Sequence, residues 1–169
     1  IRLAFALPVI DVLEELLRKI RPYEKVAGST NRAFEKGMDA VVEGLKLHGI
    51  SGLKKGFKKA IDLMNQVKYD RTNRRPRVLI VGEYLLNFHP GANHDIEDYL
   101  EHNGFEIIEA HMTDVIQKSY FYLDAQIKEY KLKKPLDKKI WFSTVDKVFD
   151  MAHNMTDAIA KKHPLYTPA

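Results

Sequence analysis

The feature that most constrains the fold is a pair of short apolar runs separated by a helical segment. The first run, Val78–Val81, is rich in β-branched residues, which is typical of a strand covered on both faces in a parallel sheet. Residues 95–102 then have helical character and end at Asn103-Gly104, a common left-handed helix cap. The second run, Phe105–Ile108, predicts another strand. A strand, a helix and a strand within about 30 residues predict a parallel crossover unit.

Amphipathic helices are predicted before this unit. Apolar residues recur at helical spacing over residues 8–20, and Pro22 ends that helix because the residue before a proline avoids helical angles. Two more helices are predicted over residues 29–64, with Gly49 as the stop between them. The apolar segment Leu3–Leu7 is expected to be a strand or a buried lead-in to the first helix.

The last third of the chain predicts two more helices. Apolar residues at alternating steps of four and three run from Ile116 to Tyr130 and again from Trp141 to Ile159, on either side of Pro135. This pattern favours an antiparallel helical hairpin. We expect the two apolar stripes to pack on the rest of the protein or on each other, and a dimer or partner surface is the alternative.

The fold predicted from these patterns is α/β, with a Rossmann-like parallel sheet, flanking helices and a C-terminal helical hairpin. Residues 1–111 are assigned to the Rossmann-like lobe, and residues 112–169 to a helical segment that packs on it. Because the sequence begins at Ile1 rather than Met and stops without completing a pattern, we expect it to be a fragment of a larger protein.

Composition excludes several kinds of site and partner. The sequence has 169 residues and 0 cysteines, so disulfides, thiolate zinc sites, cysteine nucleophiles and cysteine-held iron–sulfur clusters are excluded within it. The net charge of +4 is mild, and no nucleic-acid partner is predicted. No apolar run approaches the roughly 20 residues of a membrane span. We therefore predict no membrane partner and expect a cytoplasmic protein.

The polar segment after the first strand is the predicted site. In open parallel sheets, ligands bind beyond the carboxyl ends of the strands. Four polar side chains lie there after Val81, namely Glu83, Asn87, His89 and Asn93. The carboxylate is a candidate base, and the imidazole and amides suit a carbonyl, a phosphate or a thioester edge. The alternative is structural: Glu83 pairs with a nearby arginine, and His89 only shapes the turn before the next proline.

Two more residues are candidates, and two kinds of ligand are not predicted. Tyr23 and Glu24 would reach this segment if the first helix packs nearby. The segment carries neither G-x-G-x-x-G nor a P-loop, which argues against a dinucleotide or a nucleoside triphosphate. The set His89, His94 and Asp95 includes metal-ligand types, but its spacing matches no zinc pattern, and no metal is predicted.

These residues also carry a likeness to a known family. The stretch VGEYLLNFHPGANHDIEDYLEHNGFEII, residues 81–108, resembles part of the 2-hydroxyacyl-CoA dehydratase components, which belong with the benzoyl-CoA reductase family. The likeness is greatest to the long acyl-CoA dehydratase activase-related proteins, in which an ATP-dependent activator is joined to such a component. Residues 20–29, IRPYEKVAGS, resemble the preceding segment of those proteins. The likeness covers roughly residues 8–110.

The resemblance implies Rossmann-like lobes that hold a 4Fe–4S cluster near a CoA thioester, and an ATP-dependent activator that injects one electron. Since the family's cluster is held by cysteines, it implies here a non-catalytic lobe that holds no cofactor and is inactive alone. The parent protein is then expected to be a lyase, a 2-hydroxyacyl-CoA dehydratase, or its activator. The implied partners are the remaining lobes of the parent and an acyl-CoA substrate. By matching position, the motif residues are Glu83, Asn87, His89, Pro90 and Asn93.

Two other functions stay open at this point. One is a stand-alone module that binds CoA or another phosphate compound at the segment Glu83–Asn93. The other is an interaction scaffold that uses the C-terminal helices.

Overall fold

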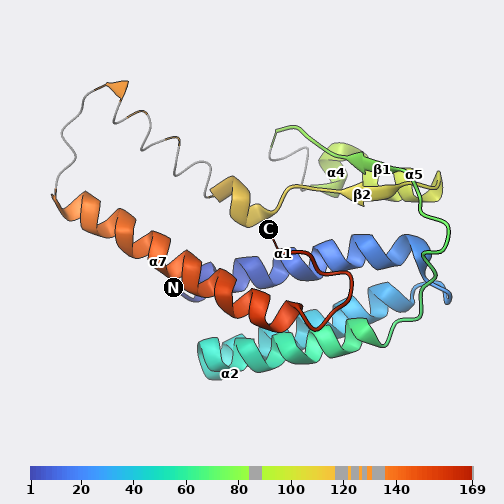
Figure 1. Ribbon diagram of the computed structural model, residues 1–169, viewed down its shortest axis with the longest axis horizontal. Coiled ribbons are helices and arrows are strands. Elements are labelled where there is room, and N and C mark those ends of the chain that lie inside the picture. The colour runs from blue at the N-terminus through green and yellow to red at the C-terminus, as the bar shows by residue number, and fades with distance from the viewer. Residues whose placement is uncertain (84–88, 117–121, 123–125, 127–128, 131–135, 169) are drawn as a thin grey trace.

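The computed structural model describes residues 1–83, 89–116, 122, 126, 129–130 and 136–168. It is mostly helical, with one small sheet (Figure 1). Its elements in chain order are α1 (Arg2–Ile20), the 3-10 helix η1 (Arg21–Tyr23), α2 (Ser29–Asn65), β1 (Arg77–Leu79), α4 (Pro90–Asn93), α5 (Ile96–His102), β2 (Glu106–Ile108) and α7 (Leu136–Ala160).

The main apolar core lies between α1, α2 and α7. Leu13 and Leu16 of α1 and Phe57 of α2 are fully buried there. Ala152 and Ile159 of α7 belong to the same apolar cluster. Figure 1 shows α1 with α2 and α7 on one side and the small sheet on the other. Each of these three helices buries apolar residues of its predicted stripe, although Val42 of α2 is exposed. The prediction that the last stripe packs on the protein is therefore confirmed for α7.

The long helix α2 is two helices joined at a sharp break. Gly49 has φ 60° and ψ −142°, a left-handed conformation that favours glycine. The two halves then run back against each other, because the backbone at Gly52 lies against Gly44 and the backbone at Gly56 lies against Ala40. The predicted stop at Gly49 is therefore confirmed.

The first helix begins earlier than its sequence suggests. The segment Leu3–Leu7 lies inside α1, and Phe5 and Ala6 are buried. Pro8 lies inside this helix. A proline at this position removes one backbone donor and crowds the carbonyl of Ala4, and burial of the surrounding apolar side chains offsets this cost. The strand alternative for this segment was wrong, because burial against the bundle outweighs the local signal of the proline.

The two short strands pair in parallel, with Val78 opposite Ile107. Helix α5 lies between them in the chain and ends at His102. Gly104, two residues later, has φ 89°, and the Phe105 N–H donates to the Leu100 carbonyl at 3.1 Å. This is the left-handed cap that the sequence predicts. The parallel crossover is thus confirmed, and we refer to its described residues between 77 and 111 as the crossover unit.

The Rossmann-like fold class was wrong. In the part of the chain that the structure describes, the sheet has only two strands, and the long helices pack on one another rather than on both faces of a sheet. Leu79 is 57% exposed and Val81 is 75% exposed, so the apolar run is not covered on both faces. A β-branched run predicts an extended segment, but it does not determine how many strands lie beside it.

The predicted helical hairpin falls partly on residues that the structure does not describe. Residues 112–116 are helical, and most of the first hairpin helix lies outside the described residues. The second hairpin helix is α7, which contacts α1 and α2. The division at residue 111 stays a prediction. Among the described residues, none of the helices combines the length and the apolar character that a membrane crossing requires.

Candidate functional site

The predicted site residues follow the carboxyl end of β1. Glu83 and His89 are exposed, and Asn93 is half-buried at the end of α4. Asn87 lies outside the described residues. Because β1 and β2 are parallel, the residues after β2, beginning with Glu109, leave the sheet at the same end.

Tyr23 lies at the opposite end of the sheet. Its hydroxyl donates to Glu106 Oε2 at 2.7 Å and accepts from the Arg75 N–H at 2.9 Å. Arg75 precedes β1 and Glu106 begins β2, so these contacts lie at the amino ends of the strands. Burial and the hydrogen bond to Glu106 raise the pKa of Tyr23. The structure therefore does not bring Tyr23 to the predicted site, and its contacts join η1 to the sheet.

Glu24 lies beside Tyr23 and caps helix α2. Its carboxylate accepts hydrogen bonds from the backbone N–H of Gly28 at 2.5 Å and of Thr30 at 2.8 Å. The hydroxyls of Ser29 and Thr30 donate to it as well. Burial acts to raise the pKa of Glu24, but these hydrogen bonds outweigh it and lower the pKa. Glu24 thus satisfies donors that a helix start leaves unpaired.

Replacing Glu24 with alanine is expected to lower the free energy of unfolding by about 1–2 kcal/mol, because the start of α2 loses its cap. The measurement is urea denaturation at pH 7, followed by circular dichroism. Glu35→Ala is the matched control, since Glu35 is an exposed carboxylate on the same helix. Equal stability of the two variants would contradict the capping role.

The most densely charged part of the structure lies between α1 and the crossover unit. Arg18 on α1 donates to both carboxylate oxygens of Glu97 on α5, each at 3.2 Å. The same guanidinium pairs with Glu109, which follows β2, and with Glu14, one turn earlier on α1, at 3.6 Å. One half-buried arginine therefore holds three carboxylates from three parts of the chain.

A second arginine repeats this arrangement at the end of α1. Arg21 donates to the two carboxylate oxygens of Glu101 at 2.6 and 2.8 Å. It also reaches Glu97 at 3.5 Å. Bidentate arginine–carboxylate pairs are strong and directional, so α5 is fixed to α1 mainly by these two arginines.

Two small cavities adjoin this cluster. One has a volume of about 220 Å³, and its polar lining includes Glu15, Lys19 and His111. The other has a volume of about 280 Å³ and is lined partly by apolar residues of α1. Arg18 and Glu109 line both cavities. These spaces suit a small polar group rather than a whole nucleotide.

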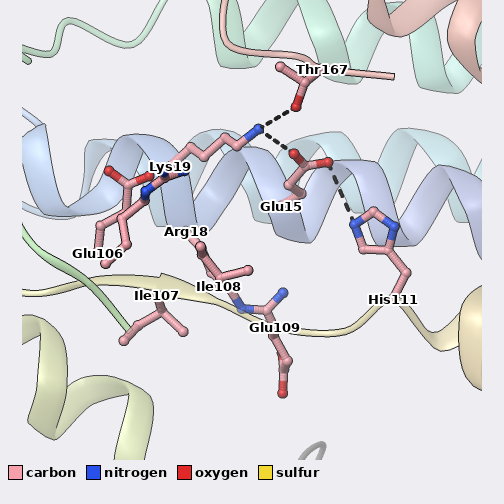
Figure 2. A pocket seen from close by; sticks show the side chains of 10 residues that line it. Glu15, Arg18, Lys19, Glu106, Ile107, Ile108, Glu109, His111 and Thr167 are labelled. Atoms are coloured by element: carbon pink, nitrogen blue, oxygen red, sulfur yellow. Dashed lines mark hydrogen bonds and ion pairs between the residues drawn. The ribbon is translucent and has the colours of Figure 1, made fainter. Parts of the chain in front are cut away.

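Figure 2 shows how the first cavity is bounded. The carboxylate of Glu15 lies between Lys19 and His111, and the His111 Nε2 atom is 3.6 Å from Glu15 Oε2. The Lys19 Nζ atom also donates to the Thr167 hydroxyl at 3.1 Å. The C-terminal residues and the segment after β2 are thus joined through side chains of α1.

The cluster contains a carboxyl group that titrates near neutrality. Burial raises the pKa of Glu109 to about 7, although Arg18 acts in the opposite direction. Burial likewise raises the pKa of Glu14. The contact of the His111 imidazole with the Glu15 carboxylate, which stabilises the protonated ring, raises the pKa of His111. A carboxyl group with a pKa of about 7 is a type of group that acid–base chemistry uses.

Asp11 holds the segment that follows these residues. Its buried carboxylate accepts from the backbone N–H groups of Met112 and Thr113, both at 2.9 Å, and from the Thr113 hydroxyl. The helical residues 112–116 therefore receive their N-terminal cap from another helix. This contact fixes the chain direction after His111.

Sequence reasoning missed this cluster for two reasons. The charged residues of α1 are spaced three or four apart, which is also the pattern of an ordinary solvated face. Glu109 and His111 could have been found, because they follow the second predicted strand as Glu83 follows the first. Ligands bind beyond the carboxyl ends of all neighbouring parallel strands, so the residues after both strands belong to the candidate site.

Among the described residues, no group of three or more acidic, histidine or cysteine side chains is arranged to hold a metal ion. Comparisons of the chain with protein-family models, with curated proteins and with solved structures find no match.

Proposed function

We propose that this chain is a non-catalytic lobe of a 2-hydroxyacyl-CoA dehydratase-type, activase-related protein, and that it lines a cleft for a CoA thioester. The observation that carries the proposal is the parallel pairing of β1 and β2. It brings the start of the segment after β1 and the segment after β2 to one end of the sheet, where ligands of parallel strands are bound.

The chemistry of this end suits a thioester. The His89 imidazole and the Asn93 amide are donors for a carbonyl or phosphate oxygen. Glu109 and His111 follow the neighbouring strand and line a small polar cavity that extends along β2 between the sheet and α1. The chain has no cysteine to hold an iron–sulfur cluster, so the residues present do not fit that group, and no electron-transfer step is assigned to them.

The resemblance of residues 81–108 to the dehydratase components supports the same proposal. It assigns the cluster and the activator to other lobes of the parent, which are then this chain's partners. A scaffold function of the last helix has less support, because α7 uses its apolar stripe in the core.

Calorimetric titration with a short-chain acyl-CoA tests the proposal. We expect saturable binding that weakens by about 10-fold or more in the double variant His89→Ala/Asn93→Ala, because two hydrogen bonds to the ligand are lost. His48→Ala, an exposed histidine on α2, is the control and should bind like the unaltered chain. Absence of saturable binding, or equal binding by the double variant, would refute the proposal. Equal affinity for free CoA would instead support a stand-alone phosphate-binding module.

A further inference from the structure

The crossover unit is attached to the helical bundle through charged and polar contacts. Arg18 of α1 and Arg21 of η1 hold Glu97 and Glu101 of α5, and Arg18 also holds Glu109. The apolar cluster of the core, by contrast, consists of residues of α1, α2, α7 and their adjoining loops. Ile107 is the buried apolar residue of the sheet, and it is not a member of that cluster.

The charges at this boundary do not balance when every group is ionised. Arg18 is one cation facing three carboxylates, those of Glu14, Glu97 and Glu109. The side chain of Glu109 is 1% exposed, so water screens its charge poorly. An additional buried negative charge beside two other carboxylates costs free energy. A proton on Glu109 removes one of the two excess negative charges, the one that is most deeply buried.

We propose that the crossover unit is a proton-controlled cap, which docks on α1 when Glu109 is protonated and loosens when Glu109 ionises. This inference is independent of the proposed ligand. Loosening separates the walls of both cavities, since Arg18 belongs to α1 and Glu109 to the segment after β2. Solvent access to the boundary between α1 and the crossover unit then increases as the pH rises.

Two of the groups that face Glu109 favour its protonation, namely the carboxylates of Glu14 and Glu97, whereas Arg18 opposes it. Arg18 and Glu14 face it from α1, and Glu97 faces it from α5. Near them, His111 faces Glu15, and its raised pKa means that it also loses its charge, and its ion pair, as the pH rises. Both titrations therefore weaken docking as the pH rises.

Amide hydrogen exchange measures docking directly. The backbone N–H groups of Met112 and Thr113 donate to Asp11 on α1, so their protection reports attachment of this segment to the bundle. With the pKa of Glu109 at about 7 when docked and at its ordinary value of 4.5 when released, the docking constant should fall about tenfold between pH 6 and pH 8. Protection factors, corrected for intrinsic rates, should fall by at least that factor. The amide of Phe57 in the α2 core should not change.

Glu109→Gln is the decisive variant, because glutamine has the shape and neutrality of the protonated acid. We expect this variant to lack the roughly tenfold change in amide protection between pH 6 and pH 8 that Glu109 causes. The double variant Glu109→Gln/His111→Gln should also lack the remaining change. Glu101→Gln is the matched control: it breaks a pair at the same boundary, and should lower protection equally at both pH values.

Two results would overturn the inference. One is protection at Met112 and Thr113 that is constant between pH 6 and pH 8, or that changes in step with Phe57. The other is a full tenfold response in Glu109→Gln. Carbon-13 titration of the Glu109 carboxyl gives an independent check, with a midpoint near 7 expected and a midpoint near 4.5 against the inference.

Discussion

Replacing Gly52 with alanine is expected to lower the free energy of unfolding by about 3 kcal/mol. A Cβ atom on Gly52 would lie 2.6 Å from the carbonyl carbon of Gly44, closer still to its oxygen, and 2.8 Å from the Cβ of His48. Real Cβ atoms do not approach backbone so closely. Because the obstacle is the backbone of the facing half of α2, a rotamer change cannot relieve it, and the two halves must separate.

Urea denaturation at pH 7 measures this effect. The matched control is Ser51→Ala, since Ser51 is the exposed neighbour on the same helix and alanine is the better helix former. The free energy of unfolding of Ser51→Ala should be unchanged or slightly higher. Gly44→Ala should be damaging for the same reason as Gly52→Ala, because its Cβ would meet the backbone of Gly52. A Gly52→Ala variant as stable as Ser51→Ala would show that the halves are not in close contact.

Acidification is expected to destabilise the protein through His163. This imidazole is 2% exposed, and burial, with a further effect of Lys19, lowers its pKa to about 4. The Leu165 N–H donates to its Nδ1 atom at 3.2 Å, which requires that nitrogen to be unprotonated. The folded state therefore binds fewer protons than the unfolded state between pH 6.5 and pH 4. The stability contributed by neutral His163 is complete above pH 6.5 and is lost as the pH falls to about 4, an effect of about 3 kcal/mol.

The quantity to measure is the difference in the free energy of unfolding between the unaltered chain and His163→Gln at pH 7, 6, 5 and 4. Glu109 titrates in an overlapping range with the opposite sign, since its pKa is raised, and the difference cancels its contribution. His163→Gln should be less stable at pH 7 but should lose about 3 kcal/mol less on acidification. His48→Gln, in an exposed position, should keep the full acid response. Parallel curves for the unaltered chain and His163→Gln would contradict the prediction.

Several parts of the fold were predictable because they depend on short-range patterns. The stop at Gly49, the cap at Gly104 and the stripe of α7 each follow from residue type and helical spacing. The parallel crossover also followed, because two apolar runs flank one short helix. These features need few contacts beyond their own segment.

The site was predicted less well. Glu83, His89 and Asn93 follow β1 as expected, but Tyr23 and Glu24 lie at the other end of the sheet, where they hold η1, α2 and the strands together. Their neighbours depend on where the chain after α2 crosses η1, and no local pattern specifies that crossing.

The sequence by itself predicted many of the helical and extended segments, because helix and strand periods and glycine conformations are properties of neighbouring residues. It did not decide Leu3–Leu7, which is helical in the structure. It also determined that no thiolate chemistry belongs to this chain. Only the tertiary structure decided that the helices form the core and that the sheet stays at two strands among the described residues. It alone placed Glu109 beside Arg18, and so set a carboxyl pKa near neutrality. Burial and charge proximity depend on segments far apart in the chain, and spacing along the sequence does not encode them.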